Sequence, residues 1–207
     1  MVKPQFAIFG WSGVISDDFE TTLNSINSVL NINNKPTLTE KEFKETFNLD
    51  FPEFWGKNGL NYTKDNIQNE FNRIYKSEIN KTKIFHYVPK AIKQITSNIQ
   101  DSFIISAHPA EFLNTKIREY NLQNYFRSKY GDVQNKRVLL TELSKISDPN
   151  KICVITDVDQ DIKIGNDLGL QTYAVLSGYN LLDRIEKAKP TEIFENVSKI
   201  AKYIKTT

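Results

Sequence analysis

The chain has 207 residues, 39% of them hydrophobic and 25% charged, which is enough apolar material for a buried core and excludes a disordered segment. Its 27 basic and 25 acidic residues leave a net charge of +2, with no charged block of the kind that binds nucleic acid or a membrane surface. No apolar run approaches the roughly 20 residues needed to span a bilayer. We therefore expect neither a nucleic-acid partner nor a membrane partner.

Cysteine usage and the N-terminus indicate a cellular compartment. Cys153 is the only cysteine and lies in an apolar run at residues 152–155, so we expect a buried thiol and no disulfide. The early apolar stretch breaks at Gly10 and then meets acids, which is typical of a strand and turn and not of a signal peptide. Both features favour a cytoplasmic location.

The first expected element is a strand at residues 5–9, because a short continuous apolar run is typical of a strand buried on both faces of a parallel sheet. From residue 18 to about residue 83 the apolar residues recur at helical spacing. Thr39 and Glu42 form a capping box at the start of one of these helices. Loops are expected around residues 31–37 and 55–62.

After Pro89 helices and strands alternate. Strands are expected at residues 102–106, 151–156 and 171–176, and Gly169 is expected to end the helix at 161–168. The other helices are expected around residues 92–95, 112–120, 137–146 and from 196 onward. This alternation predicts an α/β protein with a mostly parallel sheet, into which the helical block 18–83 is inserted.

Ligands of an open α/β sheet lie outside the carboxyl ends of its strands. The first strand presents Gly10 and Ser12 there, the second presents Ser106, and the strand at 151–156 is followed by Asp157, Asp159 and Asp161. Such an acidic cluster suits Mg²⁺. Alternatively, Asp159 and Asp161 only cap the next helix. Spacing alone leaves both interpretations open.

The segment from Phe6 to Asp18 resembles the opening motif of the haloacid dehalogenase superfamily, hhhFDxDGT[LV]xDS. Phe9, Gly13 and Asp17 match that motif, whereas Gly10 and Ser12 stand where the family has two catalytic aspartates. The resemblance is to the phosphoglycolate phosphatase-like branch with an α-helical cap. It implies a Rossmann-like three-layer core formed by residues 1–17 and 84–207, with the cap at residues 18–83.

The other motifs of the family follow in order. Ser106 matches the Ser/Thr that binds the transferring phosphoryl group, and Asp157 and Asp161 occupy the two acidic positions of the fourth motif, which implies a metal site. Lys136 is the best candidate for the lysine of the third motif, with Lys129 or Arg137 as alternatives.

In active members the first aspartate attacks phosphorus and helps to hold Mg²⁺, and the second is the acid and base. Gly10 can do neither of the first two tasks. We therefore expect a catalytically silent protein that binds a phosphorylated small molecule or a protein partner as a scaffold, regulator or sensor, with weak Mg²⁺ binding. The alternative is a divergent Mg²⁺-dependent phosphatase in which a metal-held water attacks a small phosphate ester.

Two further expectations concern the surroundings of the site. His108 is expected to be an ordinary loop residue ahead of Pro109 that the sequence does not place to serve Ser12 as a base; as an alternative, it faces the cleft because it closely follows Ser106. Most aromatic residues of the cap are expected to form its own core. Phe51, Phe54 and Trp55 lie in a stretch predicted to be irregular, and the alternative for these three is an exposed surface that binds a partner.

Overall fold

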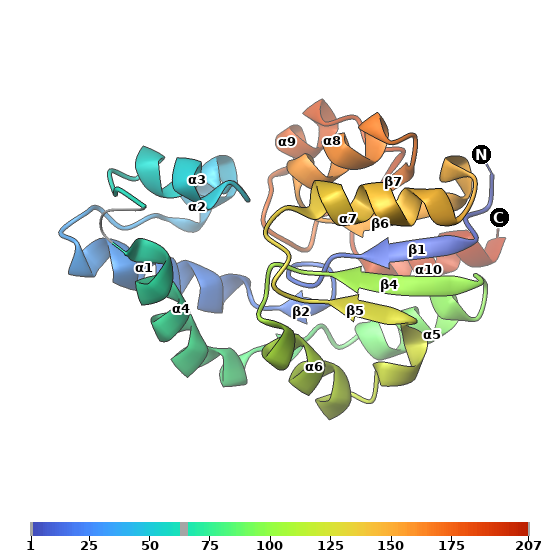
Figure 1. Ribbon diagram of the computed structural model, residues 1–207, viewed down its shortest axis with the longest axis horizontal. Helices are drawn as coiled ribbons and strands as arrows, with labels where there is room; N and C mark the ends of the chain where they lie inside the picture. The colour runs from blue at the N-terminus through green and yellow to red at the C-terminus, as the bar shows by residue number, and fades with distance from the viewer. Residues whose placement is uncertain (1, 63–65, 207) are drawn as a thin grey trace.

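The computed structural model describes residues 2–62 and 66–206. Its centre is a six-stranded sheet in the order β5-β4-β1-β6-β7-β8, and every neighbouring pair is parallel (Figure 1). The first strand lies in the middle because its four residues are almost entirely apolar and buried. The strands are β1 (Phe6–Phe9), β4 (Asp101–Ile105), β5 (Ser128–Tyr130), β6 (Ile152–Thr156), β7 (Gln171–Val175) and β8 (Glu192–Phe194).

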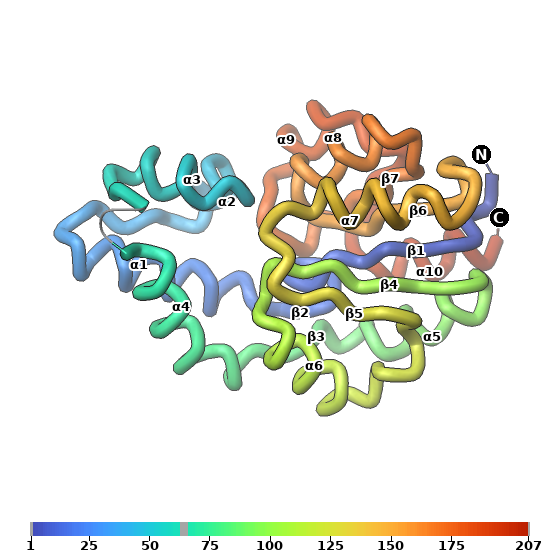
Figure 2. Tube along the Cα trace, viewed as in Figure 1, coloured from blue at the N-terminus to red at the C-terminus, as the bar shows by residue number. Residues whose placement is uncertain are grey.

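Helices cover both faces of this sheet. Ala7 and Phe9 on β1 point to one face and pack in a cluster with α5, α6 and α10, whereas Ile8 points to the other face and packs with α7 and the strands β4 and β6. In the tube view, α7 passes in front of β6, whereas α10 lies behind β1 and β4 (Figure 2). The helices are α5 (Val88–Thr96), α6 (Ala110–Glu119), α7 (Lys136–Leu143), α8 (Asp159–Asp167), α9 (Leu182–Lys187) and α10 (Val197–Thr206). The predicted three-layer α/β core is confirmed.

A second group of helices stands beyond the carboxyl ends of the strands (Figure 1). It consists of α1 (Phe19–Ile32), α2 (Glu40–Thr46), α3 (Phe51–Lys57) and α4 (Ile67–Glu78), which we call the cap. The chain enters and leaves it through an antiparallel ribbon of β2 (Ser16–Asp17) and β3 (Lys83–Ile84). Residues from all four helices share one apolar cluster, which Val158 and Tyr179 of the core join.

The structure corrects one prediction in the cap. Residues 51–57 form helix α3 where an irregular stretch was expected, because the Asp50 side chain accepts a hydrogen bond from Glu53 N at 3.0 Å and Pro52 occupies the first turn. Phe54 and Trp55 are only 1% and 2% exposed. The alternative of a partner surface built on these two side chains is therefore wrong.

Several short elements escaped the sequence analysis. The strands β2, β3, β5 and β8 have only two or three residues and lack the long apolar runs of the central strands. Single 3₁₀ turns follow four other elements, at Ile79–Lys81, Gln123–Tyr125, Ser144–Ile146 and Pro149–Lys151.

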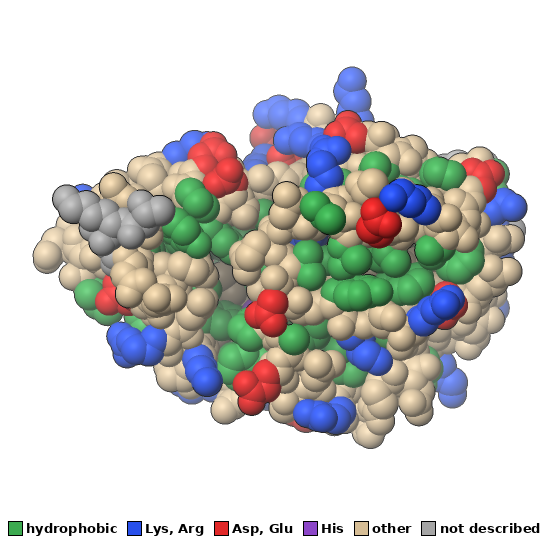
Figure 3. Space-filling view, viewed as in Figure 1, with side chains coloured by type: hydrophobic (Ala, Val, Ile, Leu, Met, Phe, Trp, Pro, Cys, Tyr) green, Lys and Arg blue, Asp and Glu red, His purple; other side chains and the backbone are tan. Residues whose placement is uncertain are grey.

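The structure tests four other features of the sequence. The capping box of Thr39 and Glu42 is confirmed, and Gly169 ends α8 with a φ of +71°. Cys153 is fully buried on β6, and burial raises the pKa of its thiol to about 12. Among residues 2–62 and 66–206, no helix combines the length and apolar character needed to cross a bilayer. On the face drawn in Figure 3, basic and acidic side chains are interspersed over the cap and core.

Candidate functional site

A cavity of about 170 Å³ lies between the cap and the carboxyl ends of β1, β4 and β6. The core side of this cavity contains Gly10, Ser12, Ser106, Lys136 and Asp157, so five of the six predicted site residues meet here. The cap side includes the aromatic residues Phe47, Phe51, Phe54, Trp55, Phe71 and Tyr75, together with the polar residues Thr22, Gln68 and Asn72. The cavity is therefore lined by both polar and aromatic side chains.

Gly10 follows β1 and continues its ladder, since its N–H donates to the carbonyl oxygen of Ile155 at 2.8 Å. A Cβ atom at this position would lie 3.4 Å from Val14 Cγ2 and 3.5 Å from the Ile155 oxygen. These are ordinary or slightly tight contacts, and no positive φ is imposed on Gly10. The backbone thus has room for a side chain here, and the missing carboxylate is a property of the sequence and not of the packing.

Asp157 is held in a pocket made by two glycines. A Cβ atom on Gly13 would lie 2.3 Å from Asp157 Oδ2, and one on Gly178 would lie 2.0 Å from it, so only glycine fits at either position. The N–H of Tyr179 donates to the same oxygen at 2.8 Å. Burial nevertheless raises the pKa of Asp157 to about 7, although the Tyr179 N–H and Lys136 act in the opposite direction. Near neutral pH this carboxyl group is therefore partly protonated.

Lys136 is the first residue of α7, which Asn135 caps. Its Nζ lies 2.6 Å from Asp161 Oδ2, and the Thr156 hydroxyl donates to the same oxygen at 2.9 Å. The two alternatives for this lysine lie elsewhere: Lys129 Nζ donates to the carbonyls of Gln123 and Phe126, and Arg137 pairs with Asp167 at the surface.

Asp161 lies behind Lys136 and does not line the cavity. Its second oxygen, Oδ1, is buried and has no hydrogen-bond partner among the described residues. Asp159 is also engaged, in ion pairs with Lys163 and Arg184. Neither acid caps α8, because Val158 occupies the N-cap position and no side chain makes a capping bond there. Both acids nevertheless lie in the first turn of α8, where negative charge favours the helix N-terminus, so only the capping hydrogen bond of that interpretation is absent.

These residues do not fit Mg²⁺, the usual cofactor of the family that the sequence resembles. Mg²⁺ needs near-octahedral oxygen ligands, and carboxylates serve it only when ionised. Gly10 offers no side-chain ligand, and Lys136 pairs with Asp161, which leaves Asp157 as the one carboxylate of the predicted set that faces the cavity. Within the part of the chain that the structure describes, no three acidic, histidine or cysteine side chains are grouped so as to hold a metal ion. Weak Mg²⁺ binding stays a prediction.

The structure brings together three groups that the sequence analysis had not combined. Ser12 Oγ lies 2.8 Å from His108 Nε2 and donates to Asp18 Oδ2 at 2.8 Å. His108 Nε2 and Asp18 Oδ2 are themselves 3.1 Å apart. The expectation that His108 is an ordinary loop residue is therefore wrong. One feature of the sequence pointed to His108 as a site residue: it comes just after the strand that ends at Ser106.

Ser106 and Tyr179 hold this group in place. Ser106 is 4% exposed, and its hydroxyl accepts a hydrogen bond from the N–H of His108 at 3.0 Å. The Tyr179 hydroxyl donates to Asp18 Oδ1 at 2.9 Å. Asp18 is 1% exposed, whereas the neighbouring Asp17, which matches the family motif, is exposed at the cap hinge.

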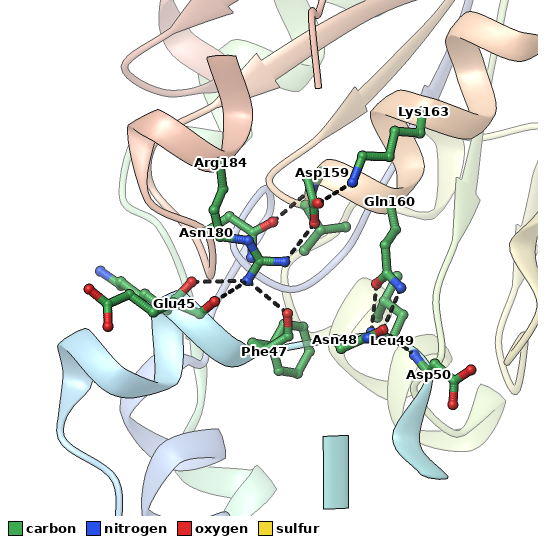
Figure 4. Close-up of polar contacts among 12 residues, drawn as sticks. Glu45, Phe47, Asn48, Leu49, Asp50, Asp159, Gln160, Lys163, Asn180 and Arg184 are labelled. Atoms are coloured by element: carbon green, nitrogen blue, oxygen red, sulfur yellow. Dashed lines mark hydrogen bonds and ion pairs between the residues drawn. The ribbon is translucent and has the colours of Figure 1, made fainter. Parts of the chain in front are cut away.

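Two core side chains tie the cap to the core beside the cavity (Figure 4). Arg184 Nη1 donates to the carbonyl oxygens of Lys44, Glu45 and Phe47 at the end of α2. Gln160 accepts from Leu49 N at 2.6 Å and donates to the Asn48 side chain. These contacts fix the loop between α2 and α3, from which Phe47 and Leu49 enter the cavity wall.

A doubly wound parallel sheet with a helical cap over the carboxyl end of its first strand is the architecture of a capped, Rossmann-like α/β protein. The model of the haloacid dehalogenase-like hydrolase family matches residues 7–175, and the chain belongs to that family. No curated protein matches the sequence.

Solved structures share this fold at low sequence identity. A haloacid dehalogenase-like hydrolase from Streptococcus pneumoniae has a TM-score of 0.83 at 15% identity and covers 98% of this chain and 99% of its own. A predicted phosphoglycolate phosphatase from Haemophilus somnus has a TM-score of 0.80 at 17% identity, with the same coverage of 98% and 99%. A predicted phosphatase from Clostridium acetobutylicum has a TM-score of 0.83 at 14% identity, with both chains covered completely at 100%. At these identities the likeness concerns the fold.

Proposed function

We propose that this protein does not hydrolyse phosphate esters and acts by binding a small ligand, phosphorylated at one end, between its cap and core. The single observation that carries this proposal is Gly10, which stands at the end of β1 where the family's nucleophile is expected. Without a carboxylate there, no aspartyl-phosphate forms, and the loss of a covalent nucleophile costs on the order of 10⁶ in turnover.

Groups that bind an anion are still present in the cavity. Ser106 and Lys136 line it, and the N–H groups of Trp11, Ser12 and Ala107 have no hydrogen-bond acceptor among the described residues. Convergent backbone N–H groups form concave sites that favour anions. The aromatic side chains on the cap side support a ligand whose other end is apolar. Two solved relatives are described as predicted phosphatases, which supports a phosphorylated ligand.

The second candidate is a divergent Mg²⁺-dependent phosphatase in which a metal-held water attacks phosphorus. Asp157 favours this candidate, because it still faces the cavity. The ion pair between Lys136 and Asp161 disfavours it, since it occupies a carboxylate that the metal needs. A scaffold or regulatory role with a protein partner in the cytoplasm stays a prediction from the sequence.

A panel of small phosphate esters tests the proposal. Release of phosphate is measured with and without Mg²⁺, for the wild-type protein and for Asp157→Ala, and ligand binding is followed in parallel by thermal shift and calorimetry with inorganic phosphate and the same esters. We expect binding without turnover. Mg²⁺-dependent turnover that Asp157→Ala abolishes would favour the second candidate, and turnover that Asp157→Ala leaves intact would point to a contaminant.

A further inference from the structure

Ser12 Oγ lies on the floor of the cavity, 2.8 Å from His108 Nε2, and its hydroxyl donates to Asp18 Oδ2 at 2.8 Å. We propose that Ser12 is a nucleophile for acyl transfer from neutral carboxylic esters, with His108 as its base. This activity uses the same cavity as the phosphorylated ligand proposed above but does not require that ligand. It needs neither Gly10 nor a metal ion.

The three groups form a triangle and not a linear relay, because one imidazole nitrogen faces both partners. In the neutral tautomer whose proton is on Nδ1, His108 Nε2 takes the Ser12 proton after the hydroxyl turns to it from Asp18 Oδ2. The imidazolium that forms then lies 3.1 Å from Asp18 Oδ2, which stabilises the new positive charge. Asp18 is thus a positioning residue, since it acts through His108.

The base is held firmly in its place. The His108 ring stacks on Tyr75, with 5.3 Å between the ring centroids, and the N–H of His108 is bonded to Ser106. The Tyr179 hydroxyl bridges Asp18 to Thr22, with bonds of 2.9 Å and 2.7 Å. Side chains of both cap and core therefore preorganise the triangle, and the reaction needs little rearrangement.

The cavity indicates the class of substrate. Phe51, Phe71 and Phe112 are part of the wall and suit a short apolar acyl or aryl group, which an uncharged ester supplies. The N–H groups of Ser12 and Ala107, which have no acceptor among residues 2–62 and 66–206, are available to a developing oxyanion.

The reaction proceeds in two balanced steps. Ser12 Oγ forms a bond to the carbonyl carbon, the C–O bond to the alcohol breaks, and the alcohol leaves with the proton that His108 had accepted. Water then attacks the acyl-serine with His108 again as base, which releases the carboxylic acid and restores the Ser12 hydroxyl.

The test uses p-nitrophenyl butyrate and a fluorophosphonate, in which Ser12 Oγ displaces fluoride from phosphorus. We expect release of p-nitrophenol above the rate of buffer hydrolysis, and a single fluorophosphonate adduct that peptide mass mapping places on Ser12. Ser12→Ala should abolish the adduct, and His108→Ala should slow both reactions about 100-fold or more. His86→Ala is the matched control: this other histidine contacts Tyr87 outside the cavity, and its loss should leave both rates unchanged.

Thermal unfolding checks that each variant folds, and the mapping on wild-type protein does not depend on any variant. An adduct on Ser106 or another residue, equal rates for Ser12→Ala and wild type, or no reaction above background would each overturn the proposal. Phosphate binding and the absence of phosphate-ester turnover are measured separately, so acylation and the proposed function can fail independently.

Discussion

Arg184 and Asp159, both from the core, form an ion pair at 2.8 Å that aims the other arm of the guanidinium at the cap (Figure 4). Nη1 meets three carbonyl oxygens at the end of α2, where the helix dipole is negative. Asp159 fixes the arginine in turn through its own ion pair with Lys163. Arg184 therefore fastens the cap over the cavity.

Arg184→Ala should loosen the cap. Charged hydrogen bonds to partly buried carbonyls are lost, so we expect the free energy of unfolding to fall by roughly 1–3 kcal/mol. Amide hydrogen exchange at residues 44–49 should accelerate. Arg137→Ala is the control, because its ion pair with Asp167 is about half exposed on both sides and should contribute little. Equal effects of the two variants would contradict a specific fastening role.

Gly10→Asp together with Ser12→Asp should restore phosphoryl chemistry. A Cβ atom at position 10 meets nothing closer than 3.4 Å, so the backbone accepts the new carboxylate, which also supplies the missing ligand for Mg²⁺. We expect Mg²⁺-dependent hydrolysis of p-nitrophenyl phosphate above the wild-type background. The single variant Gly10→Asp should bind Mg²⁺ more tightly in calorimetry. A folded but inactive double variant would mean that the rest of the pocket has diverged as well.

Asp157→Asn should change how stability depends on pH. Burial raises the pKa of Asp157 from 3.8 to about 7, so its protonated form stabilises the fold fully below about pH 4, and this stabilisation is lost as the pH rises through about 7. Asparagine cannot ionise and avoids the loss. We expect the variant to gain stability relative to wild type between pH 4 and pH 8, by up to about 1.4 kcal/mol per pH unit.

Urea denaturation in EDTA measures this difference. Asp167→Asn, at the exposed end of α8, is the control and should show little pH-dependent change relative to wild type. An equal pH dependence in wild type and Asp157→Asn would contradict the raised pKa.

Gly178→Ala should destabilise the protein by roughly 1–3 kcal/mol, because its Cβ atom would lie 2.0 Å from the Asp157 carboxylate and force overpacking. Gly56→Ala in α3 is the matched comparison. No heavy atom lies within 4 Å of a Cβ there, so alanine should stabilise the helix by about 0.5–1 kcal/mol. Chemical denaturation of both variants tests whether the free energy of unfolding falls in Gly178→Ala and rises in Gly56→Ala.

Sequence patterns were sufficient for the long elements. The four buried runs at β1, β4, β6 and β7 and the helices with regular apolar spacing follow from local periodicity, which needs no knowledge of neighbours. The strands β5 and β8 have only three residues each and are half-buried, and they form because an existing sheet offers them an edge. The residues of β5 and β8 therefore carry no local pattern that predicts a strand.

The sequence by itself determined that Gly10 carries no nucleophile, because the absence of a side chain depends on no neighbour. It also determined the α/β fold and the inserted cap, since both appear in the order of local patterns. Only the tertiary structure decided that Asp161 is paired with Lys136 and that Ser12, Asp18 and His108 meet. Ser12 and His108 are 96 positions apart in the chain, and hydrogen bonds of that range depend on how β1 and β4 align in the sheet, which local spacing does not encode.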